Sequence, residues 1–135
     1  MKTLPLVVVL VLVLAGCSAG KPAAPADCLD VPADVQQTIA EGANETTITP
    51  VAASAVKSPT EDGLYLVAMS FTLPDTEDPQ TGVWATHGLD AASAGPIYAV
   101  DGFAHEFTVW PNTVNGHDLS VTEPGADEAK ACLEG

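Results

Sequence analysis

Cysteine is the residue type whose positions in this sequence most clearly predict chemistry. The chain of 135 residues has three cysteines, Cys17, Cys28 and Cys132. Cys17 directly follows an apolar run, whereas the other two lie near opposite ends of the remaining sequence. A cysteine sulfur can carry a lipid, close a disulfide or bind a metal, and the residues around each cysteine discriminate between these uses.

The residues before Cys17 predict an export signal. Lys2 precedes the apolar stretch 4–14, and small residues follow it, which is the order typical of a secretory signal. These ~11 apolar residues would extend about 16 Å as a helix, too short for a hydrocarbon core of about 30 Å. The run Leu14-Ala15-Gly16-Cys17 resembles the lipobox of bacterial lipoproteins, which implies cleavage before Cys17 and lipid attachment to it. The alternative is an ordinary signal peptide in which Cys17 is incidental.

Cys28 and Cys132 remain once Cys17 is assigned to lipid. An even number of cysteines in an exported domain favours a disulfide, here one that would join the two ends of the domain. Closure of a loop of roughly 100 residues is worth about 4.7 kcal/mol in the chain-entropy model. Two free thiols are the alternative. A CxxC pair is absent from the sequence, so redox catalysis has no support.

The charge balance excludes one large class of partners. The chain has 18 acidic residues against four basic ones, all lysine, and a formal net charge of -14. Binding to nucleic acid through a basic face is excluded because phosphate contacts need clustered Lys and Arg. Anionic lipids would also repel the chain, so attachment to a membrane must depend on the lipid on Cys17.

The chain divides into three parts. Residues 1–16 are the predicted signal peptide, and 17–27 contain the lipidated cysteine and a flexible tether rich in Ala and Pro. Residues 28–135 are long enough for a single small domain. We expect this domain to be a monomer.

Apolar periodicity predicts a helix followed by strands. Val31, Val35 and Ile39 form one stripe of a helix that Asp30 or Val31 caps and that Gly42 ends with a positive φ. Strands are expected over 47–58, 64–73, 82–87 and 96–100. The connections between them are short, and one of them, 74–81, is an acidic turn. This spacing favours an antiparallel meander.

The segment 101–110 allows two interpretations. Asp101-Gly102 fits a hairpin turn, or Asp101 caps a helix that presents Phe103, Phe107 and Trp110 on one face and ends at Pro111. We favour the helix. A last helix is expected from Glu123 through Cys132. The predicted fold is therefore α+β, with a three- to four-stranded antiparallel meander, an N-terminal helix and one or two C-terminal helices on one face. The disulfide would join the first and last helices.

Five aromatic residues are the candidates for binding a ligand. They could line a groove between the sheet and the aromatic helix, although packing into the core of so small a domain is the favoured alternative. The residues are Trp84, Tyr98, Phe103, Phe107 and Trp110.

Metal, cofactor and catalytic signatures are missing from the sequence. The histidines, His87, His105 and His117, have no HxH or HExxH spacing. The acidic run 75–78 lacks the glycine and distal glutamate of a calcium loop, and neither a GxSxG elbow nor an SxxK motif occurs. We therefore expect no metal, no cofactor and no catalytic residues.

The chain also resembles a family of small actinobacterial lipoproteins, some of them encoded by phages and prophages. The segments that carry the resemblance are CLDVPADVQQTIAEGAN, AVKSP, GLYLVAMSF, GVWATHGL, IYAVDGFAHEFTVWP and AKACL. The resemblance implies a lipid anchor and paired terminal cysteines, and it implies no activity and no catalytic residues.

These observations favour a non-enzymatic binding module anchored by lipid to the outer face of the cell membrane. Its expected partner is an envelope protein or a cationic protein. In a phage-encoded protein, the module would exclude superinfecting phages by occupying a membrane or injection component. The alternative function is a small-ligand carrier or envelope enzyme with a pocket between the sheet and the aromatic helix.

Substitution Cys17→Ala tests the predicted anchor. The variant is expected to lose membrane retention, because the remaining chain is strongly acidic and has no other predicted attachment. Fractionation of cells that express either chain, followed by detection of the protein in membrane and soluble fractions, measures this loss. A variant that stays fully membrane-bound would contradict lipid attachment at Cys17.

Overall fold

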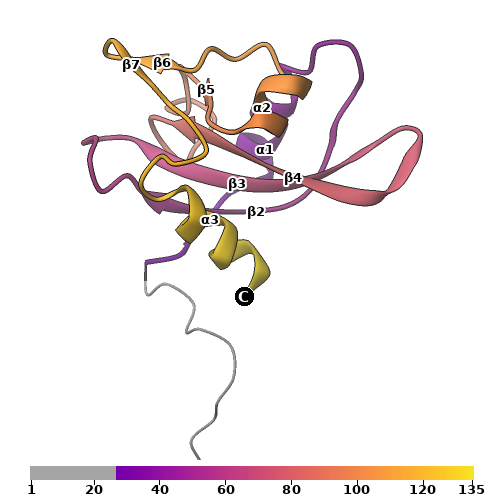
Figure 1. Cartoon of the computed structure of the whole chain (residues 1–135). Helices are drawn as coiled ribbons and strands as arrows, with labels where there is room; N and C mark the ends of the chain where they lie inside the picture. Colours follow the sequence, from indigo (N-terminus) through magenta and orange to yellow (C-terminus); the bar gives the residue numbers. More distant parts are fainter. Residues whose placement is uncertain (1–26) are drawn as a thin grey trace, which may run out of the picture.

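The computed structural model describes residues 27–135, in which an antiparallel sheet is covered by helices on both faces (Figure 1). Five strands follow the chain order β1-β2-β3-β4-β5, and two short strands form a separate hairpin. The strands are β1 (Leu29–Asp30), β2 (Thr49–Lys57), β3 (Tyr65–Leu73), β4 (Thr76–Thr86), β5 (Tyr98–Ala99), β6 (Thr113–Val114) and β7 (His117–Asp118). The helices are α1 (Ala33–Ala40), α2 (Gly102–Phe107) and α3 (Ala126–Glu134). The predicted α+β fold with an antiparallel meander is confirmed.

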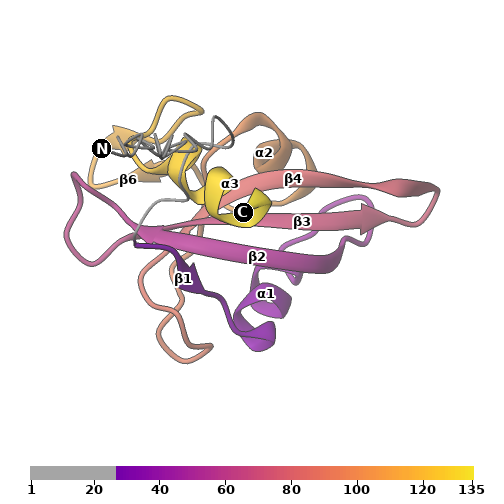
Figure 2. The ribbon, with the colours of Figure 1, turned by 90° about the horizontal axis from the view of Figure 1, so that it is seen from below.

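Strand β3 explains why the sheet has helices on both sides. Its alternate residues Val67, Met69 and Phe71 lie in one buried cluster with α1 and α2. Leu66 and Ala68 point to the other face and lie in a second cluster with α3. Figure 2 shows α3 in front of the sheet when it is viewed from the side opposite α2. The prediction that the helices cover one face is wrong, because a strand that is apolar on both faces needs cover on both.

The strand count differs from the prediction because β1 precedes α1. Leu29 and Asp30 pair with Ala55 and Ser54 of β2, so Asp30 belongs to a strand and does not cap the helix. The N-cap of α1 is Pro32, whose carbonyl accepts from the amides of residues 35 and 36. A short edge strand of two residues leaves no periodic signal from which sequence analysis could have found it.

Gly42 follows the end of α1, whose C-cap is Glu41, and it does not play the role expected of it. It does not adopt a positive φ, unlike Gly63, Gly116 and Gly125. A Cβ at Gly42 would instead lie 2.3 Å from the indole ring of Trp110. The glycine is therefore needed for the close approach of the chain to Trp110.

The β3–β4 hairpin is longer than predicted. Leu73 pairs with Thr76 and Phe71 with Gln80, so the acidic segment expected as a turn is mostly strand. The outer part of β4 is exposed. Strand β5 pairs only with Trp84 and Ala85, which leaves this part of β4 as a sheet edge. Pro79 is tolerated there because an edge residue needs no donor on its outer side.

The segment after β5 forms the helix that we favoured over a hairpin. The side chain of Asp101 accepts from the backbone amide of Ala104 and caps α2. The helix ends at Phe107 and does not reach Trp110. Thr108 is extended and forms an isolated antiparallel bridge with Ala43, which takes the chain out of the helix.

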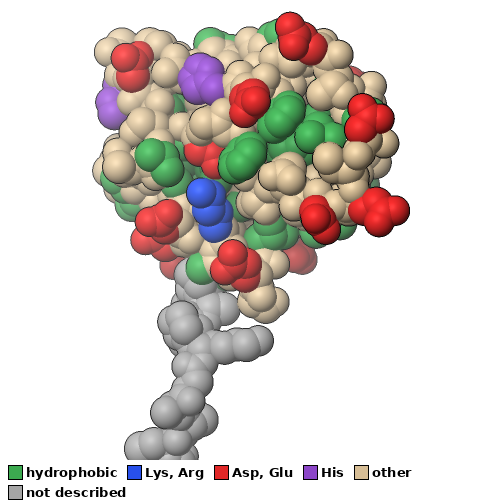
Figure 3. Space-filling view, turned by 45° about the vertical axis from the view of Figure 1, so that its right-hand side comes forward, with side chains coloured by type: hydrophobic (Ala, Val, Ile, Leu, Met, Phe, Trp, Pro, Cys, Tyr) green, Lys and Arg blue, Asp and Glu red, His purple; other side chains and the backbone are tan. Residues whose placement is uncertain are grey.

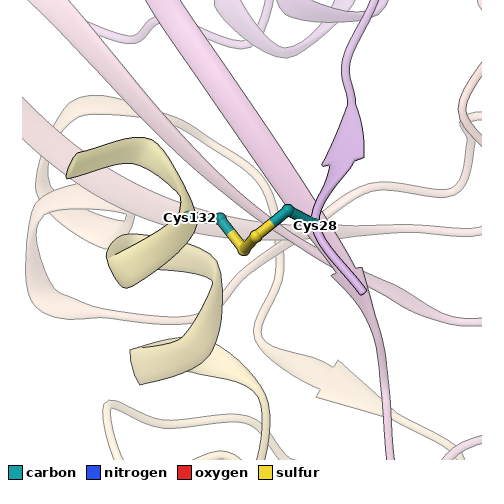
Figure 4. Close-up of a disulfide and its surroundings, with 2 residues drawn as sticks. All are labelled: Cys28 and Cys132. Atoms are coloured by element: carbon teal, nitrogen blue, oxygen red, sulfur yellow. A yellow bond between two sulfur atoms is a disulfide. The ribbon is translucent and has the colours of Figure 1, made fainter. Parts of the chain in front are cut away.

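Cys28 and Cys132 form a disulfide, with an S–S distance of 2.01 Å and a Cα–Cα distance of 5.6 Å. The bond joins the residue before β1 to α3 (Figure 4), so it links the last helix to a strand and does not link it to the first helix, as was expected. Both ends of the described chain are thereby held on the α3 side of the sheet.

The predicted signal peptide, Cys17 and nearly all of the tether lie outside the described residues. Within residues 27–135, none of the helices has the length and hydropathy required to cross a membrane.

Removal of the disulfide by Cys28→Ala together with Cys132→Ala is expected to lower the free energy of unfolding by about 3–5 kcal/mol. The bond spans 104 residues, and its loss restores the entropy of that loop to the unfolded chain. Urea unfolding of the full chain, followed by tryptophan fluorescence, measures the difference. Cys17→Ala serves as the cysteine-removal control and should unfold like the unsubstituted chain. Equal unfolding midpoints for all three proteins would show that the bond does not stabilise the fold.

Candidate interaction surface

The five candidate aromatic residues do not gather around one cavity. Trp84, Phe107 and Trp110 belong to the cluster beneath α1 and α2. Tyr98 packs against the opposite cluster, on the α3 side of the sheet. Phe103 is largely outside both clusters, with 44% of its surface exposed.

Side chains fill the space between α2 and the sheet. Trp84 is fully buried, and its indole Nε1 donates to Oγ1 of Thr108 at 3.1 Å. Phe71 makes edge contacts with Trp84 and with Phe107, with ring centroids 5.9 and 5.6 Å apart. These residues form a packed core, and the indole N–H of Trp84 has the hydrogen-bond partner that a buried indole requires.

Trp110 and Tyr98 also have structural contacts. The Nε1 of Trp110 donates to the carbonyl of Ile39 at 2.9 Å, which ties the segment after α2 to the end of α1. Tyr98 lies against His87 with ring centroids 5.7 Å apart, and its hydroxyl is 3.4 Å from the His87 Nε2. Neither residue lies with Phe103 at the surface.

Phe103 and Phe107 form an exposed aromatic pair on α2. Their rings are stacked, with an interplanar angle of 6° and centroids 6.3 Å apart. Phe107 is half-buried and contacts the core, whereas Phe103 lies outside it. The ring of Phe103 is therefore exposed to solvent, next to the ring of Phe107, which packs against the core.

The loop that carries Asn44 and Glu45 is hydrogen-bonded to the end of α2. The backbone amide of Asn44 donates to the carbonyl of Phe107 at 3.1 Å, and its side-chain amide donates to the carbonyl of Glu106 at 2.8 Å. The side-chain carbonyl of Asn44 accepts from the backbone amide of Glu45. Glu106 and Glu45 are both exposed. These bonds hold the loop that carries Glu45 against the end of α2, which carries Glu106.

We call this region the α2 surface and define it by Phe103, Phe107, Val109, Glu45 and Glu106. Val109 is 67% exposed and donates its amide to the carbonyl of Gly42. Figure 3 views the side of the molecule on which α2 and the β3–β4 hairpin lie, and it shows exposed hydrophobic side chains with Asp and Glu side chains around them and a Lys side chain next to them.

Asp101 positions the α2 surface. Its carboxylate is buried, and Oδ1 accepts from the amides of Val83 at 3.1 Å and Ala104 at 3.0 Å. Oδ2 lies 3.6 Å from Nζ of Lys130 on α3. One side chain therefore connects β4, α2 and α3, and it sets where α2 begins.

Glu123 is a second buried acid, just before α3. Its Oε2 lies 3.1 Å from Nε2 of His117, which is half-exposed. Its Oε1 is buried and has no hydrogen-bond partner among residues 27–135. The pair links the β6–β7 hairpin to the start of α3 and lies outside the α2 surface.

A hollow of about 610 Å³ lies beside the disulfide. Its walls come from the start of the described chain, the end of β2 and the start of α3; Leu29, Val56 and Pro59 are apolar, whereas Asp27, Lys57 and Glu128 bring charges of both signs. This mixture favours no single class of ligand. The hollow is also distant in the fold from the predicted groove under α2, since α3 and α2 cover opposite faces.

The remaining acidic and histidine side chains form no further centre. Among the described residues, no three or more His, Cys, Asp or Glu side chains are arranged to hold a metal ion. The hydroxyl of Ser93 donates to Asp90 and lowers the pKa of that exposed carboxyl, which stabilises a loop and has no contact with the α2 surface.

Sequence reasoning missed the loop that contains Asn44 and Glu45. The loop reaches α2 through hydrogen bonds between residues about 60 positions apart. No local pattern at Asn44 signals such a contact. The sequence signals nearest to this contact are Gly42 and Trp110, because a glycine can allow a distant aromatic ring to approach the backbone.

Comparison with known proteins adds no relative, because no family model, no curated protein and no solved structure matches the chain.

Substitutions of Asp101 test its role in positioning α2. Asp101→Ala is expected to lower the free energy of unfolding by about 2–4 kcal/mol, because it removes an N-cap and leaves the buried Val83 amide without an acceptor. Asp101→Asn keeps an oxygen acceptor and loses only the charge near Lys130, so about 1 kcal/mol is expected. Urea unfolding measures both values. Equal losses for the two variants would show that the two amide bonds contribute little.

Proposed function

We propose that the protein is a non-enzymatic interaction module, anchored by lipid to the outer face of the cell membrane, that contacts an envelope protein through the α2 surface. The signal-like residues 1–16 and the Leu14-Ala15-Gly16-Cys17 run support the anchor. The exposed aromatic pair supports the contact, since exposed aromatic side chains are enriched where proteins bind one another.

The observation that carries this proposal is the placement of the two ends relative to α2. Cys28, where the domain begins, is bonded to α3 on one face of the sheet. The α2 surface lies over the other face (Figure 1). In a chain tethered through residues before Cys28, the α3 side faces the membrane and the α2 surface faces outward.

The charge of the chain fits this arrangement. A net charge of -14 opposes adsorption of the domain to an anionic lipid surface, so the tether can hold it away from the headgroups. The α2 surface then remains accessible. The same charge favours a partner that is basic, whose association would be accelerated by electrostatic attraction.

Photo-cross-linking in intact cells tests the proposed contact. A benzophenone amino acid placed at Val109, in the α2 surface, is expected to give a discrete cross-linked product with one envelope protein. The same amino acid at Asp127, an exposed residue of α3, is the matched control and should not give this product. Immunoblotting after irradiation compares the two. A product from Asp127 alone, or from neither position, would refute a contact through the α2 surface.

A further inference from the structure

Phe103 presents an exposed aromatic ring. The ring of Phe107 lies nearly parallel to it, at an interplanar angle of 6° and with centroids 6.3 Å apart, and Phe107 is itself held by an edge contact with Phe71. The side chain of Phe103, which is 44% exposed, therefore lies beside a ring that the core holds in place. The other exposed large apolar residues, Val51, Val109 and Val121, are aliphatic and have no π-face.

Two exposed acidic residues lie on α2 and on the loop that is bonded to it. Glu106 is three residues after Phe103 on α2, a spacing that places neighbouring side chains on one helix surface. Glu45 is held near the same helix by Asn44, which bonds the carbonyls of Glu106 and Phe107. Of the two lysines in residues 27–135, Lys57 is exposed beside the disulfide, and Lys130 lies 3.6 Å from the Asp101 carboxylate that caps α2. Among the described residues, neither lysine forms an ion pair with Glu45 or Glu106.

We propose that the α2 surface binds an arginine side chain presented by a basic segment of the partner protein. The guanidinium plane stacks on the exposed ring of Phe103, and its N–H groups donate to the carboxylate of Glu106, with Glu45 adding a second negative charge. This inference rests on the proposed function, because it names the partner chemistry for the same surface.

The shape of the surface favours arginine over lysine. A guanidinium is planar, stacks on aromatic rings and presents several donors in one plane, so it can contact a ring and a carboxylate at once. An ammonium is a compact, strongly hydrated charge that gains less from a flat ring. The chain itself has no arginine, so the group must come from a partner.

Peptide titration of the full-length protein in a neutral detergent provides the test. The probes are three fluorescently labelled peptides of equal length that differ only in three positions, which hold arginine, lysine or the neutral isostere citrulline. Fluorescence anisotropy measures each dissociation constant at low and high salt. The arginine peptide is expected to bind at least about threefold more tightly than the lysine peptide. The citrulline peptide is expected to bind so weakly that its titration does not reach saturation.

Three variants assign the binding to the α2 surface. Phe103→Leu keeps an apolar side chain and is expected to weaken the arginine peptide about 3- to 10-fold while leaving the lysine peptide nearly unchanged. Glu106→Gln should weaken both peptides by roughly tenfold and reduce the salt dependence. Asp127→Asn removes the same charge from α3 and should change binding less than twofold. All four substituted or unsubstituted proteins should unfold at similar urea concentrations, because the three side chains are exposed.

The possible results separate this inference from the proposed function. Equal affinity for the arginine and lysine peptides, or equal losses from Glu106→Gln and Asp127→Asn, would mean general charge attraction and would overturn the arginine site. If that occurs while Val109 still cross-links to an envelope protein, the interaction function stands and only the arginine contact is wrong. If the peptides behave as expected but Val109 gives no product in cells, the surface can hold arginine and the proposed function is wrong.

Discussion

The two-sided burial of β3 is the constraint from which the architecture follows. Val67, Met69 and Phe71 need cover on one face, and Leu66 and Ala68 need it on the other. Helices α1 and α2 cover the first face, and α3 covers the second. In a domain of roughly 100 residues, each of these helices is short, so packing against the sheet alone stabilises it little and further bonds are needed. The disulfide supplies such a bond to α3, and the Asp101 carboxylate supplies hydrogen bonds to α2.

The same constraint places the disulfide and the α2 surface on opposite faces of the sheet. Cys28, near the start of the described residues, and α3 are bonded together on one face, and α1 and α2 cover the other. The aromatic pair on α2 lies over that opposite face, and it is fixed by Phe71 from within and by Asn44 from the side. Asp101 connects the two faces, since its oxygens contact β4, α2 and Lys130 of α3.

Much of this fold could be predicted from local patterns. The alternation in 64–73 identified β3, the spacing of Val35 and Ile39 identified α1, and Asp101 identified the cap of α2. The parity of the cysteines identified the disulfide. What escaped prediction depends on contacts across the fold. The side of the sheet that each helix covers, strand β1 and the packing of Gly42 against Trp110 are decided by distant partners, which a linear pattern does not contain.

The site was harder to predict than the fold for the same reason. The sequence groups the aromatic residues by their spacing, whereas the structure separates them by how deeply each is buried. Trp84 is enclosed by α2 and the sheet, and Phe103, on the same helix as Phe107, is left in solvent. Glu45 is held near α2 because the neighbouring Asn44 donates hydrogen bonds to the backbone of Glu106 and Phe107, about 60 residues later in the chain.

The prolines of β2 and β4 have a consequence for molecules that are crowded together. Strand β2 contains Pro50 next to a bulge, and the outer part of β4 contains Pro79 beside Glu77 and Asp78. These are the two sides on which β1 and β5 cover only two residues each. An approaching strand from a second copy would meet a missing donor and like charges on one side, and an irregular register on the other. Two copies that meet edge to edge are therefore hindered from joining their sheets.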